Sequence, residues 1–572
     1  MDLRAEPRND VDTPLERARP LTALGVLAAC FAVGAVFTFP LILKLTTHFP
    51  SAPGDDDVFG FIWNNWWISH SILELHQSPL TTNYLFAPFE VDLRLHTFGL
   101  LYGVLFMPIT VLAGPVVTLN LQALATPALN GYFAFVLARY LTRDNRAAFV
   151  AGLAIAATPA INFHIAIGRV SCAALWPAIA SLYCFLRLLE QPRIPQMLRF
   201  SAALWALLLI DQQIALFGVL WLVVVALCLC LTTAGRHQIF DRRVVTVVLL
   251  AIALALPAGY WLYVRPFMQV TGYSVPAASE AATYSYPLSL LWTPSMAWRV
   301  YGSVLIGGLL SALLIAIRVP KVLPWLLGAG LFIALSFGPG VEGADVYRPF
   351  ALLRDLIGTD QFRTPYRFQM PAALGAAMCL SFVLAWLRPR LNRRVIPFAI
   401  AAIAAIVPID LLFYRVPKGF PVQTLAGSPA YTMIAGDTQP GIVLEVPFGV
   451  RSGTDRIGTG ERLNFYQPIH GRRIINGMIA RVPLAALQYY RGSPALMLLA
   501  ADAPIPAGDI EADLHARLGE LQVSHVVVHL AMLNDERRRR ILDLFSSASE
   551  LQKQYEDQDV VLFRVESTSR AR

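Results

Sequence analysis

Long apolar runs, separated by short segments that carry arginine, recur through most of this sequence. Residues 21–43 and 115–141 are two examples, and each reaches the roughly 20 apolar residues that a helix needs to cross a bilayer. Hydrophobic residues make up 56% of the chain and charged residues only 15%, whereas soluble domains carry about a quarter charged residues. The pattern therefore predicts a mainly α, polytopic helical membrane protein.

The arginines indicate which ends of these helices face the cytoplasm. Residues 1–20 contain four arginines, and residues 139–146, at the end of the 115–141 run, contain three more. Cytoplasmic segments of membrane proteins are enriched in Lys and Arg, so we expect both segments on that side. The apolar run 98–112 then does not cross, since crossing would place residues 139–146 outside. The net charge of +8 reflects this distribution and does not indicate nucleic-acid binding.

This pattern predicts about 11 spans and two domains. Residues 1–412 form the membrane domain, with a first external loop at 44–114. Residues 413–572 contain more charges, turns and short β-type runs, which predict a small α/β domain, and an odd number of spans places it outside the cytoplasm. Its expected strands are 441–446, 523–530 and 559–565, and its expected helices are 510–521 and 534–544. The expected spans are 21–43, 115–141, 147–160, 172–189, 200–210, 214–231, 244–262, 304–317, 322–337, 366–387 and 395–412.

Three consecutive carboxylates lie in the first external loop, within P-S-A-P-G-D-D-D-V-F-G-F-I-W-N-N-W-W at residues 50–67. The aromatic residues after them fall on one face of a helix, which is typical of a helix lying in the membrane–water interface. Acids held there could serve as a base on a lipid-borne substrate, or they could simply cap the helix. The catalytic candidates are Asp55, Asp56 and Asp57. Asp55 is favoured because it lies furthest before the helix; Asp57 suits a cap or supporting acid, and Asp56 lies between these roles.

Several arginines fall in loops on the same predicted outer side as the acids. Arginine suits phosphate because its planar guanidinium donates paired hydrogen bonds. The alternative is that each anchors a helix end in the headgroup region. Arg363 fits the phosphate role better, since it lies mid-loop between Phe362 and Pro365. The donor- or phosphate-binding candidates are Arg363, Arg265, Arg169 and Arg348. Accessory candidates are His96, His164, Glu280 and Trp63, and the two histidines could serve in acid–base or metal chemistry.

The layout resembles the GT-C superfamily of membrane glycosyltransferases, which has a first span, a long acidic external loop, many further spans and an external C-terminal domain. Asp55-Asp56-x-x-Phe59 looks like the Asp-Glu-x-x-Tyr pattern of protein mannosyltransferase- and aminoarabinose transferase-type members, with conservative changes at two positions. A closer likeness is to a group of bacterial membrane proteins that share a Gly-Asp stretch, an Ile-Trp-Asn-x-Trp-Trp helix and a Tyr-x-Phe-x-Pro turn. These features match residues 54–55, 62–67 and 84–88, and later ones match 362–368 and 443–447.

The resemblance implies a glycosyltransferase, acting as a hexosyl- or pentosyltransferase. It would take a sugar from a polyprenyl-phosphate-linked donor and pass it to an unknown acceptor on the outer side of a bacterial cytoplasmic (inner) membrane. In that family an acid at the start of the first external loop is the expected base or metal ligand. The N-terminus would be cytoplasmic and the C-terminal domain extracytoplasmic. The expected partners are the lipid bilayer, the lipid-linked donor and the acceptor. A divalent metal is compatible with the sequence but not required by it.

Two other classes of function stay open at this point. A transporter or flippase of lipid-linked sugars is expected to have interrupted helices in two equivalent halves and charges in mid-span, which the sequence does not show. A non-catalytic membrane scaffold with an external binding domain would leave the acids and the external arginines without a role. A transferase makes a distinct structural prediction, namely that these acids and arginines converge on one cleft.

Overall fold

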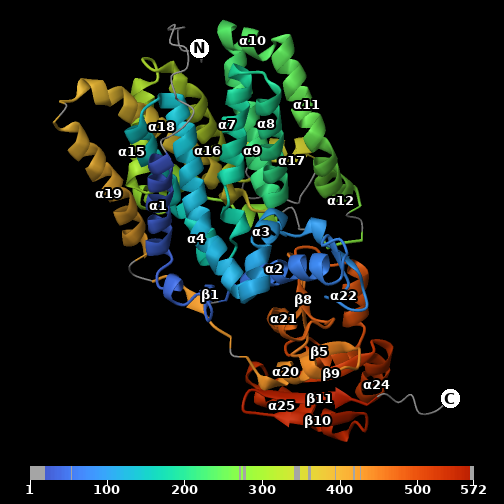
Figure 1. The fold of residues 1–572 in the computed structure, drawn as a ribbon. Helices are drawn as coiled ribbons and strands as arrows, with labels where there is room; N and C mark the ends of the chain where they lie inside the picture. The colour runs from blue at the N-terminus through green and yellow to red at the C-terminus, as the bar shows by residue number, and fades with distance from the viewer. Residues whose placement is uncertain are drawn as a thin grey trace.

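The computed structural model describes residues 20–52, 54–269, 272–274, 279–339, 348–357, 362–392, 394–415, 419–425 and 427–566. It contains a helical domain, a C-terminal α/β domain and, between them, a layer built from the first loop (Figure 1). Helices α2 (Asp57–Leu73) and α3 (Leu100–Leu105) lie in this layer. The predicted cytoplasmic segment before residue 20 lies outside the described residues.

The helical domain supports the prediction of a polytopic membrane protein. Among the described residues, six helical segments are long and apolar enough to cross a bilayer, and a seventh results if α14 and α15, bent by 106°, form one span. Shorter apolar helices coincide with the other expected spans, so the number 11 stays a prediction. The main helices are α1 (Pro20–Phe37), α4 (Met107–Thr142), α5 (Asn145–Ala156), α6 (Pro159–Ala166), α7 (Trp176–Glu190), α8 (Ile194–Ile210), α9 (Gln212–Cys230), α10 (Thr233–Ile239), α11 (Arg242–Gly259), α14 (Pro294–Tyr301), α15 (Ser303–Ile315), α16 (Leu323–Ser336), α18 (Gln369–Leu387) and α19 (Ile396–Arg415).

The run 98–112 is broken into short helical pieces, which agrees with the prediction that it does not cross. α3 has six residues and is capped at Phe106. α4 begins directly afterwards, but Gly114 has a φ of +86° and interrupts its helical geometry just before Pro115. Glycine adopts this left-handed conformation at little cost, and proline cannot extend the hydrogen-bond ladder of the preceding turn. At about 1.5 Å per residue, neither piece reaches the roughly 30 Å of a hydrocarbon core.

The aromatic face of α2 packs against protein, so the interpretation that this face contacts the membrane–water interface is wrong. Its residues from Val58 to Ser71 are buried, and Trp63 and Trp67 have no exposed surface. These two rings stack with centroids 5.6 Å apart, and the Trp63 Nε1–H donates to Gln467 Oε1 of the C-terminal domain at 2.6 Å. An apolar stripe on a helix indicates a partner but cannot distinguish lipid from protein. Here the partner is the C-terminal domain.

The C-terminal domain carries two sheets. The larger has the order β10-β11-β9-β5, in which β5 (Ile442–Val446) runs parallel to β9 (Val523–His529). β11 (Val560–Val565) and β10 (Leu551–Glu556) complete it, while α24 (Ile510–Glu520) and α25 (Asp535–Ser547) are its long helices. The strands β5, β9 and β11 and both helices coincide with the predicted ones, whereas β10 was not predicted. The expected domain boundary at 412/413 falls inside α19, which ends at Arg415.

The smaller sheet faces the helical domain and has the order β7-β6-β8. Its strands are β6 (Gly449–Arg451), β7 (Arg456–Gly458) and β8 (Gly477–Met478). In Figure 1 it lies nearer to α2 than the larger sheet, which forms the far end of the molecule. A further pairing joins the two parts of the chain, because β1 (Phe49–Pro50) of the first loop is antiparallel to β4 (Val422–Gln423). The first loop and the C-terminal domain thus share a core and a sheet.

Candidate active site

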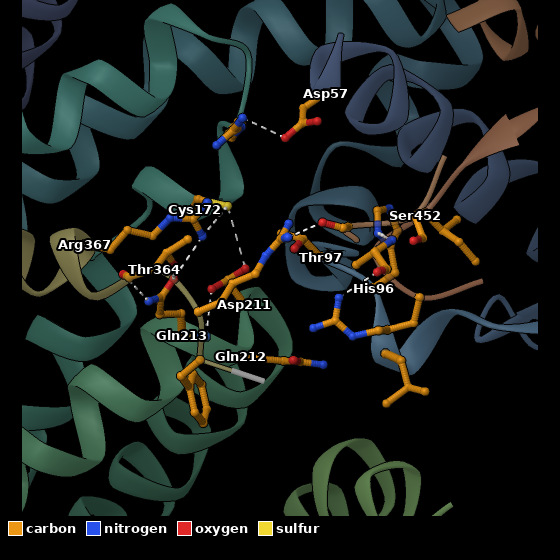
Figure 2. Close-up of a pocket in the computed structure, with 18 of the residues that line it drawn as sticks. Asp57, His96, Thr97, Cys172, Asp211, Gln212, Gln213, Thr364, Arg367 and Ser452 are labelled. Atoms are coloured by element: carbon orange, nitrogen blue, oxygen red, sulfur yellow. Dashed lines mark hydrogen bonds and ion pairs between the residues drawn. The ribbon is translucent and has the colours of Figure 1, made fainter. Parts of the chain in front are cut away.

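A cavity of about 230 Å³ lies where the first loop, the helical domain and the smaller sheet meet (Figure 2). Among the described residues, five arginines and two aspartates line it: Arg169, Arg363, Arg367, Arg451, Arg481, Asp57 and Asp211. Arginine is the majority charge even if Asp55 and Glu280 are added, which pair with two of these arginines. The hypothesis of a transferase predicted that acids of the first loop and arginines of other loops converge on one cleft.

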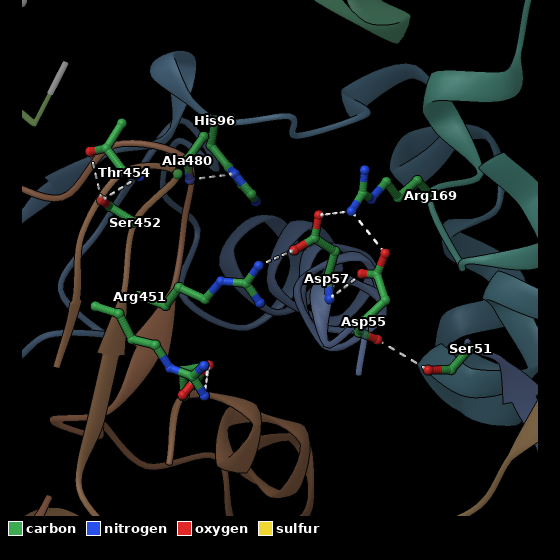
Figure 3. Close-up of polar contacts among 12 residues, drawn as sticks. Ser51, Asp55, Asp57, His96, Arg169, Arg451, Ser452, Thr454 and Ala480 are labelled. Atoms are coloured by element: carbon green, nitrogen blue, oxygen red, sulfur yellow. Dashed lines mark hydrogen bonds and ion pairs between the residues drawn. The ribbon is translucent and has the colours of Figure 1, made fainter. Parts of the chain in front are cut away.

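The first-loop acids are joined by one arginine. Nη2 of Arg169 lies 2.9 Å from Asp55 Oδ2 and 2.8 Å from Asp57 Oδ2 (Figure 3). Arg169 follows α6, so this bridge connects the loop to the helical domain. Burial acts to lower the pKa of Arg169, but the carboxylates of Asp57 and Asp55 raise it above its usual range. The guanidinium therefore stays charged and holds both carboxylates at the N-terminus of α2.

The contacts of the three acids differ from those the sequence suggested. Asp57, the first residue of α2, lines the cavity. Asp55 accepts a hydrogen bond from the backbone N–H of Asp57 at 3.2 Å, which is the kind of contact that caps a helix. Asp56 stands at the N-cap position, where its side chain makes no capping bond. The sequence favoured Asp55 as the acid that faces a substrate and Asp57 as the helix cap. The structure shows the opposite contacts, because Asp57 lines the cavity and Asp55 makes the capping contact.

The smaller sheet of the C-terminal domain holds three groups of the site. Arg451 Nη2 lies 3.4 Å from Asp57 Oδ1, on the side opposite Arg169 (Figure 3). The carbonyl of Gly453, in the turn after β6, accepts from Arg363 Nη1. The backbone N–H of Ala480, just after β8, donates to His96 Nδ1 at 3.1 Å. The C-terminal domain therefore forms one wall of the cavity.

The helical domain forms another wall of the cavity. Arg363 pairs with Glu280 Oε2 at 2.8 Å, so two predicted site residues contact each other. Arg367 donates to Gln213 Oε1 at 2.9 Å, and Thr364 Oγ1 donates to the same oxygen at 3.2 Å. Burial, together with the nearby Arg363, lowers the pKa of Arg481 to about 10, against the opposing effect of Glu280. Side-chain partners therefore hold the guanidinium groups of Arg363 and Arg367 in place at the cavity.

Other predicted residues lie away from the cavity lining. Arg265 stacks over the Trp261 ring at 4.4 Å, and Arg348 donates from Nη1 to the Phe337 carbonyl at 2.7 Å. His164 is buried in α6 and stacks on Tyr366, which itself lines the cavity. Trp63 is buried against Gln467, as described above. Within the part of the chain that the structure describes, no group of three or more His, Cys, Asp or Glu side chains is arranged to hold a metal ion.

A crevice adjoins the cavity, and an apolar groove adjoins the crevice. The crevice shares His96, Asp211 and Gln212 with the cavity. The groove, of about 570 Å³, shares Leu208 with the crevice and runs along α8, α9 and α11. Apart from Gly259, every residue that lines the groove has an apolar side chain. The three hollows form a series from the arginine-lined cavity to an apolar surface of the helical domain.

Solved structures with the same arrangement identify the fold. The chain is similar to the arabinofuranosyltransferase AftD from mycobacteria, with 16% sequence identity, a TM-score of 0.57, and coverage of 96% of this chain and 40% of that one. It is also similar to the oligosaccharyltransferase of Archaeoglobus fulgidus, with 14% identity, a TM-score of 0.50, and coverage of 90% and 70%. The chain has the GT-C fold. No family model and no curated protein matches the sequence.

Within this GT-C fold, sequence reasoning missed the contribution of the C-terminal domain. Arg481 follows Asn476-Gly-Met-Ile-Ala, and a lone charge in such an apolar stretch was the available signal. Arg451 similarly follows the apolar run of β5 and β6. Arg367 precedes an apolar run, so from the sequence it could equally anchor a helix end in the headgroup region. Its place beside Arg363 in one segment before α18 is what brings both to the cavity.

Proposed function

We propose that this protein is a membrane glycosyltransferase that moves a sugar from a polyprenyl-phosphate-linked donor to an acceptor on the outer side of the membrane. The observation that carries the proposal is the convergence of Arg169, Arg363, Arg367, Arg451 and Arg481 on one cavity beside the Asp57 carboxylate. Arginine clusters of this kind suit the oxygens of a phosphate or pyrophosphate. The names of the two structural relatives, both glycosyltransferases, support the same class of reaction.

The charges fit the bond changes of such a transfer. Asp57 takes the proton of the acceptor hydroxyl as that oxygen attacks the anomeric carbon of the sugar. The bond from this carbon to the lipid phosphate oxygen breaks, and the phosphate leaves with its negative charge. Guanidinium groups already in place stabilise that charge without having to reorganise during the reaction. Arg169 and Asp55 position Asp57 from one side, and Arg451 does so from the other.

The apolar groove supports a lipid-linked donor. A polyprenyl chain is purely apolar, and so are the side chains along α8, α9 and α11. With the phosphate in the cavity, the chain would pass Leu208 at the crevice and continue into the groove. Burial of apolar surface stabilises this placement by about 25 cal/mol per Å². A soluble sugar nucleotide would leave the groove without a role.

The distribution of arginine supports an outward-facing site. α10 and the start of α11 carry Arg236, Arg242 and Arg243, and they lie at the end of the helical domain opposite α2 (Figure 1). The positive-inside rule assigns that end to the cytoplasm. The cavity would then open on the other side of the membrane, where lipid-linked donors are used once they have been flipped.

The test is glycan profiling of a deletion strain complemented with wild type, Asp57→Asn or Asp543→Asn. Asp543 is exposed on α25 and gives a matched Asp-to-Asn change away from the cavity. We expect wild type and Asp543→Asn to restore a glycan or glycolipid that the deletion strain lacks, and Asp57→Asn to fail although it inserts normally. A deletion that alters no glycan or glycolipid would refute the proposal.

A further inference from the structure

The side chain of His96 accepts a hydrogen bond from a backbone N–H of the C-terminal domain. His96 follows the short helix η2 (Leu93–Leu95), lines the cavity, and its Nδ1 accepts from the Ala480 N–H at 3.1 Å. A backbone N–H can only donate, so Nδ1 carries no proton in this arrangement. A neutral imidazole must then carry its proton on Nε2. The contact with Ala480 therefore fixes both the orientation of the ring and its tautomer.

The Nε2 atom of His96 is buried and has no hydrogen-bond partner among the described residues. A buried donor without an acceptor is costly, and native structures rarely tolerate one without a reason. The ring extends from Ala480 toward the Asp57 carboxylate (Figure 3). Burial and the Arg481 charge lower the pKa of His96 to about 4, although Asp57 opposes this shift. At neutral pH the ring thus presents an uncharged N–H to the cavity.

We propose that His96 is a substrate-positioning residue whose Nε2–H donates a hydrogen bond to an oxygen of the sugar-phosphate head group beside Asp57. The inference rests on the proposed function and adds a role for one residue. An N–H at this position does not serve as a proton acceptor or a metal ligand, since both need a lone pair on Nε2. The hydrogen-bonding chemistry is the same whether the oxygen belongs to the phosphate or to a hydroxyl of the sugar.

Two substitutions separate the two ring nitrogens. In His96→Asn the amide oxygen can still accept from Ala480, but the side chain no longer reaches the Nε2 position. In His96→Gln the terminal amide N–H₂ reaches approximately that position and restores the donor. The first variant keeps the structural contact and loses the proposed one, and the second regains it. Thermal unfolding of the purified full-length variants checks that both fold as wild type does.

Two measurements are made on wild type and both variants. The first is the rate at which the missing glycan reappears in the deletion strain after induction. The second is binding of decaprenyl phosphate to the purified protein in detergent. We expect His96→Asn to slow glycan formation about tenfold and His96→Gln to recover most of the rate. Weaker binding of decaprenyl phosphate to His96→Asn assigns the contact to the phosphate, whereas unchanged binding with slow transfer assigns it to the sugar.

Two outcomes overturn the inference and leave the proposed function intact. One is a His96→Asn protein that equals wild type in both measurements. The other is a His96→Gln protein as impaired as His96→Asn, because the N–H donor would then not be what matters. Failure of the wild-type gene to restore any glycan is a different result, which counts against the proposed function itself. In that case equal decaprenyl phosphate binding by wild type and His96→Asn also overturns the phosphate contact.

Discussion

Arg451 Nη2 of the C-terminal domain lies 3.4 Å from Asp57 Oδ1 of the first loop. The contact joins a residue of β6 to the first residue of α2, so the acid at the cavity is held by a domain that begins far later in the chain. Arg169 of the helical domain holds the same carboxylate through its other oxygen. Asp57 is therefore the point at which all three parts of the molecule meet.

We expect Arg451→Gln to lower transfer about 100-fold without unfolding the protein. It removes a cation that contacts Asp57 and that faces the phosphate in the proposed reaction, and loss of one such preorganised group typically costs about 10²–10³ in rate. Arg491→Gln is the control, because Arg491 pairs with Asp455 at 2.8 Å and does not line the cavity. Glycan formation in the complemented deletion strain is the readout. Equal activity of the two variants would argue against a catalytic role for the smaller sheet.

Asp57→Asn and Asp55→Asn should differ in degree. A general base contributes about 10²–10⁴ in rate, so Asp57→Asn should lose most of the activity. Asp55→Asn keeps an oxygen that can accept from the Asp57 N–H and should cost about tenfold or less, mainly through the weaker hold on Arg169. Initial rates of glycan formation measure both. The reverse order of severity would assign the base to Asp55, as the sequence alone suggested.

Trp63→Ala should destabilise the contact between the first loop and the C-terminal domain by about 3–5 kcal/mol, as expected for deleting a buried aromatic side chain. The change leaves a cavity and removes the hydrogen bond to Gln467. Ile469→Ala on the nearby helix α21 (Gln467–His470) is the control, since Ile469 is 42% exposed. Thermal unfolding in detergent should show a clear decrease only for Trp63→Ala. A helix whose tryptophans faced lipid would show little difference.

Acid should destabilise the C-terminal domain. Burial and neighbouring charges, Arg472 first among them, lower the pKa of His470 to about 3 and of His525 to about 4. A lowered pKa means that the unfolded chain binds the proton more tightly. Stability is therefore complete above about pH 6.5 and falls as the pH drops from there toward these values, by up to about 1.4 kcal/mol per pH unit for each histidine.

Unfolding temperatures at pH 7.5 and 5.0 measure this effect. Replacing His525 or His470 by Gln should reduce the difference between the two temperatures, whichever way the substitution shifts the stability at pH 7.5. The exposed His237→Gln on α10 should leave the difference unchanged. If all three variants behave alike, the buried histidines do not determine the acid response.

Leu208→Trp should fill space at the boundary between the crevice and the apolar groove, because Leu208 lines both. We expect weaker binding of decaprenyl phosphate and unchanged binding of a short-chain analogue such as geranyl phosphate, whose tail ends before the groove. Leu314→Trp is the control, since Leu314 on α15 is 81% exposed and lines none of the three hollows described here. Equal affinity of the variants for both lipids would show that the tail takes another path.

Hydropathy and charge predicted the helical part of this fold because both act locally along the chain. Each expected span coincides with a helix, and Gly114 before Pro115 separates the run 98–112 from the span that follows it. The alternating and apolar runs of β5, β9 and β11 likewise predicted these strands from local sequence. The convergence of Asp57, Arg169 and Arg363 followed from topology, since loops on one side of a membrane share a limited space.

What the sequence could not predict depends on contacts between distant segments. The aromatic face of α2 has the same pattern whether lipid or Gln467 lies opposite it. The roles of Asp55 and Asp57 depend on where α2 begins, and a shift of two residues in a helix start exchanges them. Arg451 ends the short strand β6 and Arg481 follows the short strand β8, and the pairing of these two strands is non-local. The positions of both arginines along the sequence therefore do not predict that they line a cavity formed in part by the first loop.

The core shared by the first loop and the C-terminal domain affects when this protein can become active during its synthesis. α2 leaves the ribosome early, but Gln467 and the smaller sheet that cover it are made only after the last membrane helix. At about 5–20 residues per second, the wait is on the order of tens of seconds. During that time the tryptophans of α2 lack their final partner, so we expect a chaperone or the lipid surface to shield them. An incomplete chain would thus lie in the membrane without an assembled site and, under the proposed function, could not use the donor.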